Sequence, residues 1–67
     1  MKNMIVISYK KEGKEIDLAL DKSRIILVER EENKVYISLD IEQKGHYLTF
    51  KDSEIAKKEF IRLTSLD

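Results

Sequence analysis

Residues 25–28 read Ile-Ile-Leu-Val, an unbroken apolar run, and residues 5–7 read Ile-Val-Ile. The neighbouring stretches differ, because residues 16–20 (Ile-Asp-Leu-Ala-Leu) and 35–39 (Val-Tyr-Ile-Ser-Leu) alternate or nearly alternate. Alternation is typical of a strand with one solvent face, whereas a continuous run is typical of a strand covered on both faces. The sequence therefore predicts a sheet protein in which two strands need cover on their second face.

The length of the chain limits where that cover can come from. A chain of 67 residues forms one domain, spanning residues 1–67, and a domain near this size buries only about 60% of its unfolded surface. Cover must come from its own helix, from another copy or from a partner. With no cysteine and one histidine, disulfides are excluded and a structural zinc site is disfavoured. Oligomerisation is the remaining common means of stabilising so small a fold.

The spacing of apolar residues and turn residues predicts a mainly β (α+β) fold. We expect a five-stranded antiparallel meander or an SH3-like small barrel with one C-terminal helix. Gly13 and Asn33 are the expected left-handed turn residues, and Ile41 is expected to point inward. The expected strands cover about residues 4–10, 15–20, 24–30, 35–41 and 46–50, and the helix covers about 53–65.

The helix is predicted from a change of period after residue 50. Asp52 or Ser53 can cap its N-terminus, and Ala56, Phe60 and Leu63 recur at helical spacing. We expect Phe60 to be buried, either at the open end of a curled sheet or across one of its faces.

Charge is dense and balanced, with 13 Lys and Arg against 13 Asp and Glu and a net charge of zero. A dedicated DNA-coating protein usually has a clearly basic domain, so this balance disfavours nucleic acid as a partner. No apolar run approaches the roughly 18 residues typical of a membrane span, and the apolar stretch near Met1 is too short for a secretion signal. The expectation is a cytoplasmic protein that makes no membrane contact.

The first hairpin resembles a known family. The stretch Tyr9-Lys10-Lys11-Glu12-Gly13-Lys14-Glu15-Ile16-Asp17 is similar to the first hairpin of the small archaeal 7-kDa chromatin proteins. The resemblance implies a two-stranded hairpin packed on a three-stranded sheet, an SH3-like barrel with a C-terminal helix. It also implies DNA binding through the three-stranded sheet, and Tyr9 and Lys10 carry over as contact positions.

The chain departs from that family where the family binds DNA. The family is strongly basic and inserts an exposed Trp and apolar wedges into the minor groove, whereas this chain is neutral and has no Trp. The corresponding stretch, residues 28–32, is rich in carboxylates, which repel phosphates. Glu29, Glu31 and Glu32 could instead form a docking patch for a basic partner or a weak cation site, although solvated turns commonly carry such runs.

No catalytic signature accompanies this pattern. His46 could join Asp40 and Glu42 in a metal or acid–base site, but a strand histidine at the rim of a core is the commoner case, since catalysis needs several convergent groups. The sequence contains no Gly-rich phosphate loop and no nucleophile elbow. We therefore expect a protein that is not an enzyme, with no catalytic residue, no cofactor and no metal ligand.

Two functions remain open from the sequence. The first is an interaction module that binds itself or another protein through an apolar sheet face. Tyr36 and Tyr47, if they share a face, would anchor such an interface, stack on bases or only pair across strands. The expected interface residues are Ile5, Ile7, Ile25, Leu27, Tyr36 and Tyr47. The second function is nucleic-acid binding, with Tyr9, Lys10, Lys11 and Lys14 as possible contacts.

Overall fold

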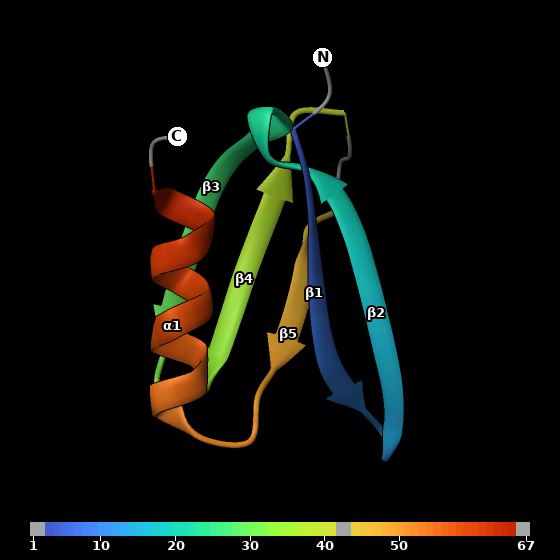
Figure 1. The fold of residues 1–67 in the computed structure, drawn as a ribbon, viewed down its shortest axis with the longest axis vertical. Helices are drawn as coiled ribbons and strands as arrows, with labels where there is room; N and C mark the ends of the chain where they lie inside the picture. The colour runs from blue at the N-terminus through green and yellow to red at the C-terminus, as the bar shows by residue number, and fades with distance from the viewer. Residues whose placement is uncertain (1–2, 42–43, 66–67) are drawn as a thin grey trace.

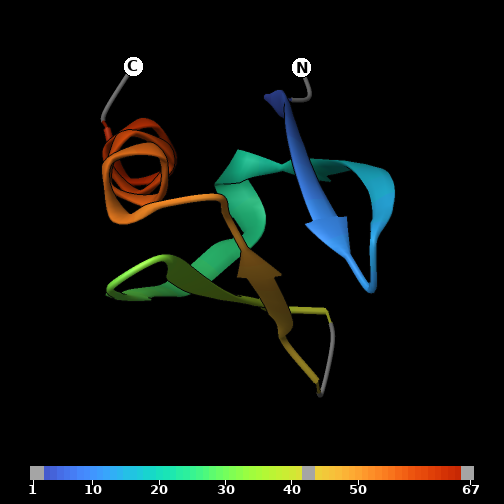
Figure 2. The same cartoon turned by 90° about the horizontal axis from the view of Figure 1, so that it is seen from below.

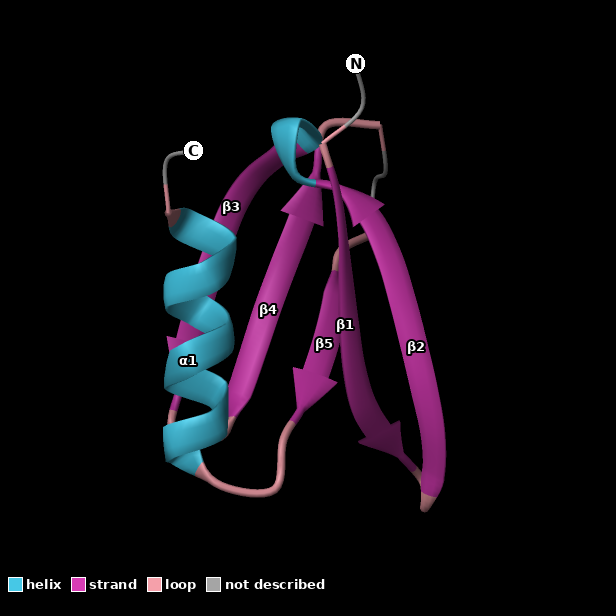
Figure 3. Ribbon diagram, viewed as in Figure 1, coloured by secondary structure: helices cyan, strands magenta, loops and turns pink. Residues whose placement is uncertain are grey.

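The computed structural model describes residues 3–41 and 44–65. It confirms a mainly β fold with one C-terminal helix. The elements are β1 (Met4–Lys11), β2 (Lys14–Asp21), the short 3-10 helix η1 (Lys22–Arg24), β3 (Ile25–Glu31), β4 (Lys34–Leu39), β5 (His46–Thr49) and α1 (Ser53–Thr64) (Figures 1 and 3). The strands form two antiparallel sheets, the hairpin β1-β2 and the three-stranded sheet β3-β4-β5.

The helix and the hairpin both lie on the same side of the three-stranded sheet. Figure 2 shows α1 and the β1-β2 hairpin side by side above β3, β4 and β5, and α1 contacts β3 and β4 while β1 contacts β5. We call the covered side of the three-stranded sheet its inner face and the other side its outer face. Among the described elements, α1 and the hairpin cover the inner face of the three-stranded sheet, and nothing covers its outer face.

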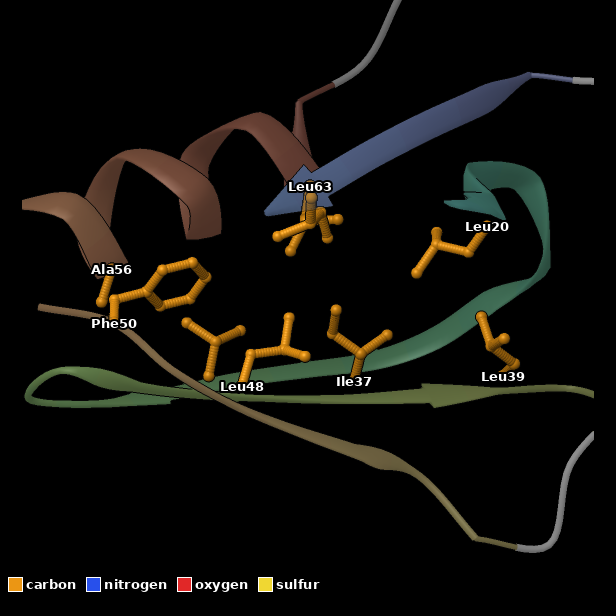
Figure 4. Close-up of a cluster of buried hydrophobic side chains, with 9 residues drawn as sticks. Leu20, Ile37, Leu39, Leu48, Phe50, Ala56 and Leu63 are labelled. Atoms are coloured by element: carbon orange, nitrogen blue, oxygen red, sulfur yellow. The ribbon is translucent and has the colours of Figure 1, made fainter. Parts of the chain in front are cut away.

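The core lies between these layers (Figure 4). On the inner face of the three-stranded sheet, β4 supplies Val35, Ile37 and Leu39, because alternate residues of a strand share a face. The side chains that complete the buried cluster are Ile7, Leu20, Leu48, Phe50, Ala56 and Leu63. Leu48 and Phe50 both point inward, with exposures of 0% and 6%.

The predicted alternation of residues 16–20 is confirmed. Residues 5–7 were expected to be covered on both faces, and instead they alternate, because Val6 points to solvent and is 55% exposed. Ile5, Ile7 and Tyr9 of β1 point inward and pair with Leu20, Leu18 and Ile16 of β2, respectively. Gly13 has a φ of 77°, as predicted, and Glu12 before it has a φ of 53°. Two successive residues with positive φ form the tight two-residue turn that matches the twist of a hairpin.

Strand β3 is irregular, and this irregularity explains its unbroken apolar run. Ile25 pairs with Leu39 but Leu27 pairs with Ser38, so Ile26 is an extra residue in a β-bulge. Ile25 and Val28 are half-buried against the core, Leu27 pairs with a residue of the outer face, and Ile26 is 67% exposed. The run was expected to be covered on both faces, and instead part of it lies at the surface.

Strand β4 is shorter than predicted. It ends at Leu39, because residues 40–41 already form a turn. At this point the backbone N–H of Asp40 donates to the Arg24 carbonyl at 2.9 Å, and the Arg24 guanidinium lies 3.6 Å from the Asp40 carboxylate. The prediction that Ile41 points inward is wrong, since it lies beyond the strand and is 67% exposed.

The turn between β3 and β4 also differs from the prediction. Glu32, rather than Asn33, takes positive φ, at 55°. Asn33 has a different role: its side-chain amide donates to the Phe50 carbonyl at 2.9 Å, and its own carbonyl accepts from the Phe50 N–H at 2.9 Å. These two bonds fix the chain after β5 against the β3-β4 turn.

The helix begins as predicted. The Asp52 carboxylate accepts a hydrogen bond from the Ile55 N–H at 2.9 Å and is the N-cap. Ala56 and Leu63 are buried, but Phe60, which was expected to be buried, is only half-buried. The buried cluster includes Phe50, Ala56 and Leu63 but not Phe60. Arg62 links the helix to the hairpin, since its guanidinium donates to the Val6 carbonyl. The Glu59 carboxylate, on α1 itself, lies 3.0 Å from the same guanidinium.

Candidate interaction surface

The outer face is built by the alternation of β4 and by its register with both neighbours. Since Val35 and Ile37 are buried, Tyr36 between them points to the outer face. Tyr36 pairs with Glu29 of β3 on one side and with Tyr47 of β5 on the other. Directly paired residues share a face, so these three side chains form one row across the outer face.

Two further rows flank this one. Ser38 and Leu27 pair toward one end of the sheet. Lys34, Glu31 and Thr49 pair toward the other end. The outer face therefore has Tyr36 at its centre with Tyr47 beside it, Leu27 at one corner, and charged and hydroxyl side chains at the other positions. Aromatic residues surrounded by a polar rim are typical of a protein–protein interface.

The two tyrosines lie against each other, as the sequence allowed. Their ring centroids are 4.6 Å apart with an interplanar angle of 45°. Tyr47 is 75% exposed and Leu27 is 44% exposed, whereas Tyr36 is half-buried. Gly45 supports Tyr36 from the side, because a Cβ at position 45 would collide with the Tyr36 ring and with the Ile37 carbonyl. The aromatic pair is thus held in place by backbone on one side and open to solvent on the other.

A hollow of about 520 Å³ lies beside the aromatic pair and is lined by residues that include Glu29, Glu31, Lys34, Tyr36 and Tyr47. Although Glu31 and Lys34 are direct cross-strand neighbours, neither they nor Glu29 form an ion pair within the described part of the chain. These charges are therefore available to a partner.

The predicted interface residues are only partly at the surface. Ile7 is fully buried at 0% exposure, because it points into the core from β1, and Ile5 and Ile25 are half-buried against that core. Leu27, Tyr36 and Tyr47 lie on the outer face as described above. The exposed apolar residues of the two runs that were not selected are Val6, at 55%, and Ile26.

Val6 does not belong to the outer face. It pairs with Ala19 on the solvent side of the hairpin, whereas the outer face belongs to the three-stranded sheet. Ile26 and Leu27 also line a groove of about 340 Å³ between the start of β3 and the C-terminal end of α1, together with Leu63 and Thr64.

The candidate nucleic-acid residues come together only in part. Tyr9, Lys10 and Lys11 line a groove of about 480 Å³ between the hairpin tip and β5, opposite His46 and Tyr47. Lys14 is exposed but does not line this groove. Tyr9 packs half-buried against the core, so less of its ring is open to a ligand than a contact position would need.

The histidine site considered from the sequence is not assembled. His46 pairs with Ile37 on the inner face of the sheet and is half-buried, and Glu42 lies outside the described residues. Within residues 3–41 and 44–65, no group of three or more His, Cys, Asp or Glu side chains is placed to hold a metal ion. Over the same residues, no helix combines the length and apolarity needed to cross a membrane.

Comparison of the chain with protein-family models, with curated proteins and with solved structures gives no match. The function is therefore argued from the surface itself.

Proposed function

We propose that this chain is a small non-enzymatic interaction module that binds a second copy of itself through the outer face of the three-stranded sheet. The observation that carries this proposal is the Tyr36–Tyr47 pair, with Leu27 nearby, on a face that α1 and the hairpin leave uncovered. Tyrosines are enriched at interface hot spots because they bury a large rigid area and keep a polar end. Sequestering this face would remove the most exposed aromatic side chain from water.

A second copy suits this face electrostatically. The chain has zero net charge, so two copies do not repel each other at long range. The face also carries both signs, with Glu29 and Glu31 on β3 and Lys34 on β4. A self-complementary patch of this kind is what a two-fold interface requires.

Sedimentation velocity over a range of protein concentrations tests the proposal. We expect a dimer that Tyr47→Ser weakens at least tenfold, which corresponds to ~1.4 kcal/mol, because truncation of a hot-spot tyrosine costs about 2 kcal/mol or more. Ile61→Ser is the matched control, since Ile61 is also exposed (56%) but lies on α1, away from the outer face. A wild-type chain that stays monomeric at about 100 μM, well above the micromolar range of modest interfaces, would refute the proposal.

A specific observation also supports the second function, nucleic-acid binding. The groove at the hairpin tip is lined by two lysines, Lys10 and Lys11, and by two tyrosines, Tyr9 and Tyr47. Cationic and aromatic side chains together suit single-stranded nucleic acid, through phosphate contacts and base stacking. This function ranks second because the chain as a whole is neutral.

Fluorescence anisotropy with labelled single-stranded and duplex oligonucleotides separates this alternative from self-association. If it holds, affinity falls steeply with salt and Lys10→Gln weakens binding, while Lys14→Gln, outside the groove, has a smaller effect. Absence of binding at low salt would eliminate it.

A further inference from the structure

We infer that the two copies meet with their strands crossed at about a right angle, so that Glu29 of each copy pairs with Lys34 of the other. This inference rests on the self-association proposed above and names the contacts that make the outer face self-complementary. It starts from the positions of Glu29, Glu31 and Lys34 around Tyr36.

Glu29 and Lys34 flank Tyr36 in two perpendicular directions. Glu29 is its neighbour across the β3-β4 pair, and Lys34 is two residues away along β4 on the same face. Cross-strand neighbours lie about 5 Å apart and alternate residues of a strand about 7 Å apart. The two charges are thus at similar distances from Tyr36, and long side chains can absorb the small difference.

Consider a two-fold axis that lies between the two facing sheets, runs parallel to them above Tyr36, and bisects the directions from Tyr36 to Glu29 and from Tyr36 to Lys34. Rotation about this axis exchanges the two directions. Glu29 of each copy then lies over Lys34 of the other, so the dimer contains two such pairs. The strands of one copy run along the cross-strand direction of the other copy. The two sheets then cross at about 90°, which is one of the two common geometries of sheet-on-sheet packing. Axes parallel or perpendicular to the strands do not create this pairing, since they place Lys34 over Lys34 or over Ser38.

The remaining side chains of the face fit the same axis. Tyr47 comes to lie over Ser38, a small residue that leaves room for the ring and offers a hydroxyl. Leu27 comes to lie over Thr49. Glu31 is the exception. It lies diagonally from Tyr36, because it is the cross-strand partner of Lys34. It is therefore close to the axis and faces Glu31 of the other copy.

This exception makes the inference distinctive, because the two neighbouring glutamates of β3 are assigned opposite roles. Both are exposed, and neutralising either changes the net charge by the same amount. Glu29→Gln removes two attractive pairs per dimer, whereas Glu31→Gln removes one repulsive contact.

Sedimentation velocity on these two variants tests the inference. We expect Glu29→Gln to raise the dimer dissociation constant about fivefold, from two pairs of ~0.5 kcal/mol each, and Glu31→Gln to leave it unchanged or lower it. The reverse order, with Glu31→Gln the damaging change, would overturn the inference.

Charge reversal gives a second and stricter measurement. Lys34→Glu places two like charges at each contact and is expected to weaken the dimer more than tenfold, and adding Glu29→Lys to the same chain is expected to restore it. Far-UV circular dichroism and thermal melting verify that each variant remains folded. Weakening without rescue, or no weakening, overturns this arrangement.

The outcomes also separate this inference from the proposed function. If the wild-type chain dimerises and Tyr47→Ser abolishes the dimer, but the charge variants behave otherwise than stated, only the crossed arrangement fails. If the wild-type chain is a monomer that captures a lysine-rich peptide at Glu29 and Glu31, or a monomer that captures nothing, both fail.

Discussion

At the scale of single residues, Gly45 does more than turn the chain. Its missing side chain leaves the space that the Tyr36 ring occupies, so we predict that Gly45→Ala destabilises the protein by about 1–3 kcal/mol through overpacking. It should also displace Tyr36 from Tyr47, and the near-UV circular dichroism signal of the tyrosines should fall. Urea unfolding and the near-UV spectrum measure the two effects.

Gly13→Ala is the matched control for Gly45→Ala. A Cβ at Gly13 meets no atom within 4 Å, but the φ of 77° is unfavourable for alanine. Gly13→Ala should therefore cost about 1 kcal/mol through backbone strain and leave the tyrosine spectrum unchanged. Equal changes in the spectrum for both variants would show that Gly45 has no special relation to Tyr36.

At the scale of elements, η1 connects the two sheets and depends on Asp21. The Asp21 carboxylate accepts from the Ser23 hydroxyl at 2.6 Å and from the Ser23 N–H at 3.0 Å, and Arg24 lies 3.9 Å away. The hydrogen bond from the Ser23 hydroxyl is the largest cause, followed by that from its N–H, of a pKa of Asp21 below its usual value of 3.8. These contacts favour the ionised form.

A lowered pKa in the folded state means that Asp21 stabilises the fold above its unfolded pKa, which is the usual value of 3.8. This contribution is lost as the pH falls through the folded value. We predict that the melting temperature of the wild-type chain falls from about pH 4 downward by more than that of Asp21→Asn. Melting curves between about pH 2 and 7 provide the measurement. Identical acid dependence of the two proteins would show that the cap makes no pH-dependent contribution.

Strands β3 and β4 differ in how much of their structure could be predicted from the sequence. The alternation of residues 35–39 predicted that Tyr36 points away from the side of Val35 and Ile37, because period two is a local property of an extended chain. Its shared face with Tyr47 stayed conditional, because it depends on the register between β4 and β5. The bulge at Ile26 was not predictable from the run itself, since it depends on the pairing of β3 with β4 and on the contacts of Arg24 with Asp40. The exposure of Ile26 and Leu27 follows from that bulge.

The charged residues of the outer face could have been predicted from the sequence. Counting by twos from Tyr36 places Lys34 and Ser38 on its face, and hairpin register adds Glu29 and Glu31. The support of Tyr36 by Gly45 was not within reach, because it depends on the path of the chain between β4 and β5, which no local pattern specifies.

At the scale of the whole molecule, the stability of the fold is expected to depend on its association with a second copy. The largest fully enclosed core side chains are Ile7, Ile37, Leu48 and Val35, whereas Tyr47, Leu27 and Ile26 remain exposed. A 67-residue chain is marginally stable by itself, and any partner that binds only the folded state adds to its stability by mass action.

The melting temperature should therefore depend on protein concentration. For a dimer, a hundredfold increase in concentration adds about 2.7 kcal/mol per mole of dimer once association is substantial, and for a domain of this size that raises the melting temperature by several degrees. Scanning calorimetry between about 5 and 500 μM measures the rise. Tyr47→Ser should flatten the dependence, while Ile61→Ser should retain it, because only Tyr47 lies on the outer face. A melting temperature that is independent of concentration in the wild-type chain would mean that the fold gains nothing from a second copy, and the exposed tyrosine would need a different partner.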